Sequence, residues 1–574
     1  MTDPQLVLTE RVQQALAAAF GAEYSDADPL IRPSQFADYQ ANVAMSLSKR
    51  LRRAPREVAQ EIADHLTDFP GTVEVSGPGF LNLTLSDDWV TAQANEVLAD
   101  PRHGVAVPES PQIVVVDYSA PNAAKEMHVG HLRTTIVGDA LVRVHEHLGN
   151  KVIRQNHLGD WGTPFGMLIE HLLDIGEKAA VAQLEAGEGN AYYQAARAKF
   201  DSDPEFNRRA RTRVVTLQAE EPETMRLWHI FMNATVRYFN KVYSQLGVTL
   251  TDDDIAGESM YNHVLAQVCD ELQERGIAVV SDGALCVFPP GYIGREGQPL
   301  PFMIRKSDGG YGYATTDMAT IRYRVQDLKA DRILYVIGAT QAQHMSMLFD
   351  SARMAGWLPE HVHAEHIQIG SVLGSDGKMF KTRIGKSIKL AELLDEAETR
   401  AAQVIRDSEY GEAERGDIAH AVGMGAVKYA DLSVSHDSEY VFDFDRMLAL
   451  TGNTGPYLQY AQARIRSIFR RGGVDPAEAT GPIVLGNPAE RALALKLLGF
   501  GAIVAEVAEN STPHRLAAYL FDTASAFTTF FEECPVLKAE DEATRASRLA
   551  LCALTLRVLE TGLGLLGVPV PERM

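Results

Sequence analysis

Apolar residues along this chain follow two spacings, one typical of strands and one typical of helices. Residues 113–116 form a short apolar run, which indicates a buried strand. Apolar residues then recur at helical spacing from Leu132 to Leu148 and stop at Gly149, a residue type that often ends helices. Similar short runs predict strands at 151–156, 333–337 and 366–372. This alternation of strands and helices predicts an α/β fold with a doubly wound parallel sheet.

The first part of the chain has a pattern of its own, and we expect it to form an appended α/β domain over residues 1–110. Helical spacing of apolar residues predicts helices at 6–20, 41–51 and 55–66. Strand-like runs at 73–76 and 80–85 flank Gly77-Pro-Gly, which is a turn signal.

The remainder of the chain divides into further regions. The domain that carries the sheet is expected to span 111–390. Within it, residues from about 176 to 250 read as a helical, highly charged insertion, and 282–288 and 301–313 read as strands around a Gly309-Gly310 turn. From about residue 390 onward the pattern is helical. We expect a linking helical region over 391–455 and an all-α bundle over 456–574.

Two histidines follow the first predicted strand, in the stretch Ser119-Ala-Pro-Asn-Ala-Ala-Lys-Glu-Met-His-Val-Gly-His131. A strand, a tight turn and a helix N-terminus form the usual phosphate-binding place of α/β folds. His128 and His131 are three residues apart, so we expect both on one face of the first helical turn. Gly130 would let a flat base lie against the backbone. A metal pair and ordinary surface histidines are the alternatives, but the H-E-x-x-H spacing of zinc helices is missing, which favours a nucleotide site.

A second motif is basic and lies far downstream. Lys378-Met-Phe-Lys-Thr-Arg383 follows Gly374-Ser-Asp-Gly377, so it is expected to lie on a loop. Taken alone, this would be read as an exposed basic loop. A loop that closes over a triphosphate and opens again would use the same residue types.

Taken together, these motifs resemble those of class I aminoacyl-tRNA synthetases, and in particular those of the arginyl-tRNA synthetase family. The first stretch is similar to that family's form of the HIGH motif. The second is similar to the KMSKS loop, with Phe380 and Thr382 in place of two serines. The resemblance extends over most of the chain through further segments: 156–166, 313–317, 341–344, 517–522 and 571–574.

The resemblance implies a Rossmann-like catalytic domain, an N-terminal domain that contacts tRNA and a C-terminal anticodon-binding bundle. It implies that an ATP site with catalytic donors is formed by Lys125, His128, Gly130, His131, Lys378, Met379 and Lys381. It also implies that an arginine pocket is formed by Asp117, Asn122, His128, Tyr313, Asp317 and Gln341. A guanidinium group carries five donors in a planar fork, so carboxylates and an aromatic ring suit its recognition. Asp117 is one methylene shorter than the glutamate often found there.

The net charge of −22 is unusual for a chain expected to bind tRNA, because phosphate contacts need lysine and arginine. Local basic runs offer an answer. The residues predicted to contact tRNA are Lys49, Arg50, Arg52, Arg53, Arg464 and Arg466, and a further run lies at 208–213. The alternative for each run is a solvated helix face.

The remaining composition fits a large enzyme. Hydrophobic residues make up 46% of the chain, and no apolar run is long enough to span a membrane. The four cysteines are scattered without C-x-x-C pairs, so a reducing cytoplasm and no structural metal are expected.

The resemblance therefore implies an arginine–tRNA ligase that is a cytoplasmic monomer. Its partners would be ATP with Mg²⁺, L-arginine and tRNA(Arg). Two alternatives remain open, namely a related synthetase with another amino-acid specificity and a tRNA-binding paralogue without activity.

Overall fold

The computed structural model describes residues 3–123, 125–185, 188–294, 296–374, 376–378, 380, 388–405 and 411–574. The chain forms two compact units. The first comprises Met1–Val107, Leu450–Gly564 and Val570–Met574, and the second comprises Pro108–Ala449 and Leu565–Pro569. Residues that are far apart in the sequence therefore share the first unit.

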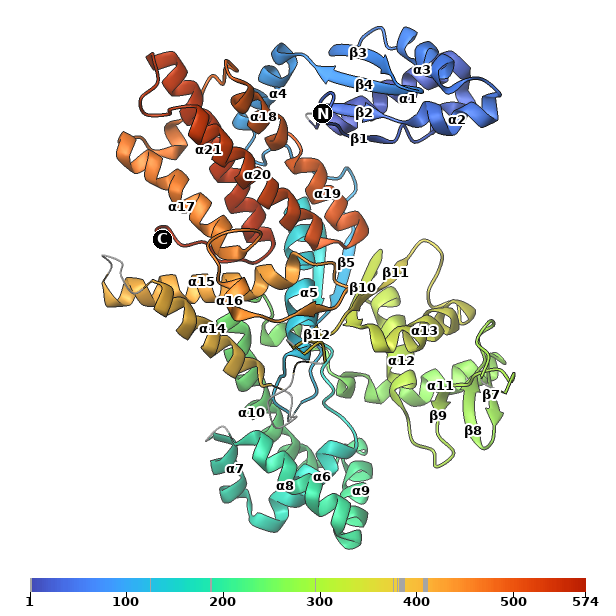
Figure 1. Cartoon of the computed structure of the whole chain (residues 1–574). Coiled ribbons are helices and arrows are strands. Elements are labelled where there is room, and N and C mark those ends of the chain that lie inside the picture. The colour runs from blue at the N-terminus through green and yellow to red at the C-terminus, as the bar shows by residue number, and fades with distance from the viewer. Residues whose placement is uncertain are drawn as a thin grey trace. The chain divides into compact units, whose positions relative to one another are not determined.

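The second unit is built on a parallel four-stranded sheet (Figure 1). Its strands, in the order β11-β10-β5-β6, are β5 (Ile113–Asp117), β6 (Lys151–Gln155), β10 (Arg332–Gly338) and β11 (His363–Ile369). The three valines of β5, at positions 114, 115 and 116, are fully buried. This confirms the parallel sheet predicted from short apolar runs, which are typical of strands covered on both faces.

The helix after β5 is α5 (Gly130–Leu148). It ends at Gly149, whose φ of 96° is in the left-handed region, which glycine enters without the steric penalty of a side chain. The helix end expected from the sequence is therefore where the structure has it.

A small antiparallel sheet was only partly predicted. Its strands are β7 (Ala278–Ser281), β8 (Ala284–Val287) and β9 (Phe302–Arg305). The strand expected to reach residue 313 is wrong in its second half, where a single bridge joins Arg305 and Tyr311. Tyr313 instead begins helix α12 (Tyr313–Gln326). Helix α13 (Ala342–Met354) follows β10.

A group of helices interrupts the sheet domain after β6 (Figure 1). They are α6 (Thr163–Ile175), α7 (Glu177–Glu185), α8 (Gly189–Ser202), α9 (Pro204–Gln218) and α10 (Pro222–Leu246). Prolines near the first position of α6, α9 and α10 suit helix starts, where the missing N–H would have no partner in the helix. The basic run on α9 is engaged in ion pairs, since Arg209 and Arg213 both lie 2.8 Å from oxygens of Glu170.

The second unit contains further elements. They are the 3-10 helix η3 (Glu258–Val264), α11 (Leu265–Glu274), β12 (Val372–Leu373), α14 (Leu390–Val404), α15 (Glu412–Leu432), β13 (Tyr440–Val441) and α16 (Phe444–Met447).

The first unit combines an antiparallel sheet with helices. Its sheet has the order β1-β2-β4-β3, with β1 (Ile31–Pro33), β2 (Tyr39–Ala41), β3 (Gly71–Ser76) and β4 (Phe80–Leu85). Its N-terminal helices are α1 (Pro4–Phe20), α2 (Val43–Leu51), α3 (Pro55–Asp64) and α4 (Asp87–Ala99). Its C-terminal bundle holds α17 (Gly455–Gly472), α18 (Pro488–Leu497), α19 (Phe500–Asn510), α20 (Pro513–Glu533) and α21 (Glu542–Leu565).

Among the helices of the described ranges, none has both the length and the apolar character of a membrane span.

Candidate active site

The two histidines of the H-x-G-H segment lie together, but not as predicted. His128 precedes α5 and forms an isolated antiparallel bridge with Lys389, whereas His131 lies in the first helical turn. The expectation that both lie on the helix is therefore wrong, because α5 begins only at Gly130. Their ring centroids are nevertheless 4.0 Å apart.

Backbone hydrogen bonds decide which ring nitrogen of each histidine carries the proton. The N–H of His128 donates to Nδ1 of His131 (3.1 Å), and the N–H of Gly130 donates to Nδ1 of His128 (3.0 Å). Both Nδ1 atoms accept, so in the neutral rings both protons are on Nε2. Burial lowers the pKa of His131 to about 3, with the neighbouring His128 as a further cause, and burial and Lys125 lower that of His128. The pair thus offers two neutral N–H donors at neutral pH.

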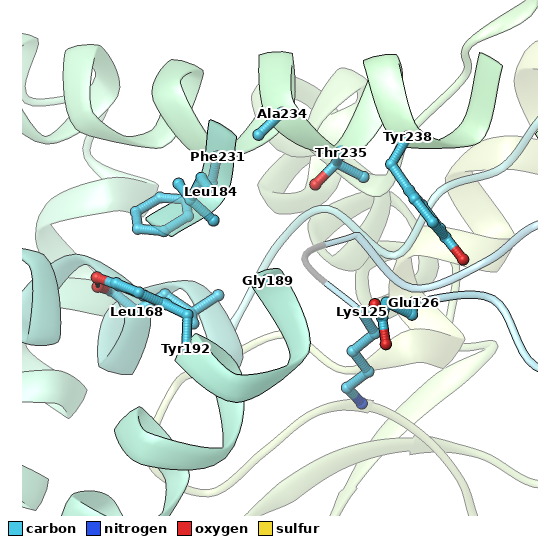
Figure 2. Close-up of a pocket in the computed structure, with 10 residues that line it drawn as sticks. All are labelled: Lys125, Glu126, Leu168, Leu184, Gly189, Tyr192, Phe231, Ala234, Thr235 and Tyr238. Atoms are coloured by element: carbon cyan, nitrogen blue, oxygen red, sulfur yellow. Dashed lines mark hydrogen bonds between the residues drawn. The ribbon is translucent and has the colours of Figure 1, made fainter. Parts of the chain in front are cut away.

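Lys125 lies on the loop before the histidines, at one side of an apolar pocket (Figure 2). The far side of the pocket is formed by Leu168, Leu184, Tyr192 and Phe231. Its volume is about 70 Å³. A small apolar cavity does not suit a triphosphate or a guanidinium group, so we do not place the reaction there. The ammonium of Lys125 lies 5.1 Å from the ring centroid of Tyr193.

Lys378 ends a tight turn that follows β12. The N–H of Gly374 donates to the carbonyl of Lys378 (2.8 Å), and the N–H of Lys378 donates to Asp376 Oδ1 (3.1 Å). The Lys378 side chain is exposed. The predictions for Met379 and Lys381 fall outside the described residues.

The chain that follows the basic motif is tied to the histidine segment by backbone hydrogen bonds. The N–H of Val129 donates to the carbonyl of Ile388 (3.1 Å), and the N–H of Leu390 donates to the carbonyl of Met127 (2.9 Å). A side-chain contact adds to these, since Lys389 Nζ lies 3.1 Å from a Glu126 oxygen. The histidine segment is thus joined to residues 388–390, which follow the basic motif in the chain.

The predicted arginine pocket contains a carboxylate at the start of α12. Asp317 is half-buried, and its Oδ2 lies 2.6 Å from Nε2 of His344. Tyr313 is one helical turn earlier and 75% exposed, so its ring is open to a ligand. Gln341 ends the segment after β10 and is exposed. Asn122 is also exposed and bridges to Gly159. The segments that carry Asn122 and Gln341 follow the carboxyl ends of β5 and β10, where parallel sheets bind ligands.

Glu258, at the start of η3, was not predicted as a site residue. Burial raises its pKa to about 8, and the carboxylates of Asp160 and Asp317 act in the same direction. Glu258 in turn contributes to a raised pKa of Tyr313. The Glu258 N–H donates to the Leu158 carbonyl (3.0 Å), and its electrostatic coupling to Tyr313 and Asp317 is the reason to consider it together with the predicted pocket. No periodic pattern surrounds it, so the sequence carries no signal for it beyond its acidic side chain.

Asp160 fixes where Glu258 lies. It is buried and accepts hydrogen bonds from the Ser259 N–H (2.9 Å) and the Ser259 hydroxyl (2.6 Å). Its own carbonyl accepts a hydrogen bond from the indole of Trp228 (2.9 Å).

Asp117 has a partner within the protein. It is 2% exposed, and its Oδ2 accepts a hydrogen bond from Nη2 of Arg324 (2.8 Å). Arg324 is fully buried and also donates from Nε to Gln155 (2.7 Å). The negative charge of Asp117 is therefore balanced inside the protein, and this geometry does not support direct contact with an arginine substrate.

The predicted tRNA-contacting cations differ in their surroundings. Arg53 forms ion pairs with Glu57 and Glu61, and Arg466 lies 2.6 Å from Glu560. Arg464 lies over the ring of Phe531 at 4.2 Å. Lys49, Arg50 and Arg52, around the end of α2, are exposed, and the Arg50 guanidinium lies 4.5 Å from the Tyr24 ring centroid.

Comparison with known families covers nearly the whole chain. Residues 93–444 match the catalytic domain of class I tRNA synthetases (R), 458–574 match the DALR anticodon binding domain, and 6–85 match the arginyl tRNA synthetase N terminal domain. The chain is 63% identical to the arginine–tRNA ligase of Thermobifida fusca, with 100% of both chains covered. It is 50% identical to that of Frankia casuarinae, with 99% of both covered.

Solved structures agree with this comparison. The arginyl-tRNA synthetase of Plasmodium falciparum superposes with a TM-score of 0.84 at 27% identity, over 99% of both chains. That of Thermus thermophilus, at 24% identity, shares the fold with a TM-score of 0.79 over 100% of both chains. The family matches and the identity to known relatives show that the chain belongs to the arginyl-tRNA synthetase family.

Proposed function

We propose that this chain is an arginine–tRNA ligase that activates L-arginine with ATP and transfers it to tRNA(Arg). One observation carries the proposal: the segment that holds the neutral histidines His128 and His131 is tied by backbone hydrogen bonds to the chain that follows the basic motif. Family membership indicates the reaction. The arrangement of the histidines gives a site where the negative charge that develops on the ATP phosphates could be stabilised.

In the first step, a carboxylate oxygen of arginine attacks the α-phosphorus of ATP. The bond from this phosphorus to the bridging oxygen breaks, and pyrophosphate leaves. Arginine is already a carboxylate at neutral pH, so no general base is required. The difficulty is negative charge on the α-phosphoryl and departing oxygens, and fixed donors reduce it. We assign this task to His128, His131, Lys125 and Lys378, and extend the proposal to Lys381.

Arginine selection is assigned to the carboxylates beside Tyr313. Asp317 and Glu258 would accept from the guanidinium, and the exposed ring of Tyr313 would stack on it. Asn122 and Gln341 suit the α-amino and α-carboxylate groups. Asp117 is paired with Arg324 and is not assigned a contact with arginine.

Mg²⁺ is expected on the phosphates of ATP. In the described ranges no three His, Cys, Asp or Glu side chains gather as metal ligands. Mg²⁺ commonly binds substrate phosphates and water rather than a protein cage, so the residues present fit this arrangement.

In the second step, a hydroxyl of the terminal ribose of tRNA attacks the carbonyl carbon of arginyl-adenylate, and AMP leaves. The family resemblance implies the 2′-hydroxyl. We assign tRNA contacts to the N-terminal domain over 1–110 and the C-terminal bundle over 456–574, with 391–455 as the link to the catalytic domain over 111–390. A cytoplasmic location and a monomeric state stay predictions.

The test is charging of total tRNA by the purified protein with each labelled amino acid in turn. We expect arginine alone to be charged. Charging of another amino acid would favour a different specificity, and no charging at all would favour a tRNA-binding paralogue.

The site assignment is tested separately with His131→Ala. Loss of one transition-state donor lowers kcat by about 10²–10³. His363→Ala, at an exposed histidine of β11, is the matched control and should charge tRNA like the wild type. Equal activity of the two variants would remove the ATP-site assignment.

A further inference from the structure

A buried arginine two residues after the H-x-G-H segment is unexplained by the proposed site. Arg133 lies on α5 and is 1% exposed. Its Nε donates to Asp431 Oδ1 (3.1 Å), Nη1 donates to the Ser438 carbonyl (2.6 Å), and Nη2 donates to the Ser435 carbonyl (3.3 Å). A buried charge is costly unless it is paired and hydrogen-bonded. All three guanidinium nitrogens are used here, so the side chain is held in one geometry.

The contacts of Arg133 reach the segment that precedes β13. The ring of Tyr440, in β13, lies 5.2 Å from the Arg133 guanidinium carbon. Burial, together with the Asp431 carboxylate, holds the pKa of the Tyr440 phenol well above its usual range, so this ring stays neutral. The Arg133 side chain therefore contacts both the Ser435 and Ser438 carbonyls, which precede β13, and the Tyr440 ring in β13.

That segment in turn holds the strand that leads to Lys378. β13 pairs in parallel with β12. The N–H of Phe442 donates to the Leu373 carbonyl (2.9 Å), and the N–H of Gly370 donates to the His436 carbonyl (2.8 Å). The backbones approach so closely that a Cβ on Gly370 would lie 2.5 Å from the Ser438 carbonyl oxygen. A stacked pair, Phe380 and Phe442, with centroids 5.0 Å apart, adds a side-chain contact.

A continuous path therefore runs from α5 to the turn that ends at Lys378. It passes from Arg133 to the carbonyls of Ser435 and Ser438, through β13 to β12, and then into the turn. After the basic motif, the chain returns at Ile388, where the Ile388 carbonyl accepts a hydrogen bond from the Val129 N–H and Lys389 pairs with Glu126. The two attachments differ, because only the one before Lys378 depends on a single side chain of α5.

We propose that Arg133 is a positioning residue that sets the place of Lys378 relative to His128 and His131. The proposal rests on the proposed function, because it concerns donors to the phosphates of ATP. Transition-state donors need placement within about 0.5 Å, and misplacement by about 1 Å can lower the rate about 10²-fold. Arg133 touches no reacting atom; it acts through the carbonyls that it holds.

The test variant is Arg133→Lys, which keeps the positive charge beside Asp431 but cannot reach three acceptors with a planar fork. ATP–pyrophosphate exchange is measured with arginine and tRNA present. We expect kcat to fall about 10²-fold and the KM for ATP to rise several-fold, while the KM for arginine stays within about twofold. Arg143→Lys is the matched control on the same helix, since Arg143 bonds Asp139 and the Gly247 carbonyl instead.

A second variant perturbs the same path elsewhere. Gly370→Ala would force the backbone before β12 away from the Ser438 carbonyl, whereas the Arg133 bonds to Asp431 and to the Ser435 carbonyl do not involve Gly370. We again expect a raised KM for ATP and a nearly unchanged KM for arginine. The loss of activity in the double variant should be smaller than the sum of the losses in the two single variants. If Arg133→Lys does not fold, this variant alone decides.

The outcomes separate the inference from the proposed function. No exchange by the wild type would overturn the proposed function itself. If the wild type is active, an Arg133→Lys variant with a lower Tm but an unchanged kcat and an unchanged KM for ATP would overturn the role of Arg133. Equal changes in both KM values would also overturn it.

Discussion

At the residue scale, the proposed role of Glu258 predicts that arginine binding depends on pH. Its pKa is raised to about 8 by burial, and by Asp160 and Asp317, so in the free protein the group is largely protonated at pH 7. A guanidinium partner favours the ionised form, so binding of arginine should release a proton. Affinity is therefore expected to rise with pH from about 6 to 8, by at most about tenfold per pH unit, and to level off above the raised pKa.

Calorimetry of arginine binding in two buffers of different ionisation enthalpy measures this proton release. Glu258→Gln should abolish the pH dependence. It should also weaken binding at pH 8 by about 10–100-fold, because a hydrogen bond to a charged group contributes about 1.5–3 kcal/mol. Glu412→Gln removes an exposed carboxylate on α15 and should behave like the wild type. A wild-type affinity that is flat from pH 6 to 8 would contradict the assignment.

At the element scale, Arg324 connects α12 to the sheet. It bonds Asp117 at the end of β5 and Gln155 at the end of β6, and it lies over the ring of Tyr335 in β10 at 4.9 Å. Removing one partner of a buried ion pair leaves an uncompensated charge, which costs about 3–5 kcal/mol. Arg324→Met should therefore lower the free energy of unfolding of the catalytic unit by about this amount, as measured by urea titration.

The double variant Arg324→Met with Asp117→Leu is the informative companion. Replacing both partners by apolar groups is often nearly neutral, so most of the lost stability should return. Because Asp117 already binds Arg324, the KM for arginine should stay near the wild-type value. If the double variant regains stability but has a strongly raised KM for arginine, Asp117 would instead be a residue that contacts the arginine substrate.

Local patterns predicted some elements well and others poorly, for physical reasons. The end of α5 at Gly149 and the strands β5 and β10 follow from apolar spacing and a helix-ending glycine. The strands β1 and β2 are three residues each and lie in a polar stretch, so pairing with neighbours defines them rather than their own pattern. Likewise, the Gly309-Gly310 turn predicts a strand that reaches Tyr313, whereas Tyr313 begins α12.

In the candidate site, too, local patterns in the sequence predict some residues and miss others. His128, His131 and the basic motif were found because they are local motifs with a known resemblance. Glu258, the Arg324–Asp117 pair and the Arg133 contacts join residues far apart in the chain, and single-sequence patterns do not show such contacts.

At the scale of the whole molecule, the predicted tRNA-binding cations differ in their exposure and in their ion pairs. The chain has a net charge of −22. Ion pairs within the protein engage Arg466, Arg209 and Arg213. Lys49, Arg50 and Arg52 are exposed around the end of α2, so the argument for a tRNA contact is strongest there. The acidic remainder would repel other polyanions and favour a local contact.

Replacing these three cations should weaken tRNA binding and reduce its salt dependence. The variant is Lys49→Ala, Arg50→Ala and Arg52→Gly, with glycine chosen because Arg52 has a φ of 53°. Each lost phosphate contact lowers the magnitude of the slope of log K against log salt by roughly 0.7–0.9. The measurement is a salt titration of tRNA affinity. Arg53→Ala is the control and should change the slope less, because Arg53 is already paired with Glu57 and Glu61. An unchanged slope in the triple variant would show that this face of α2 is only solvated.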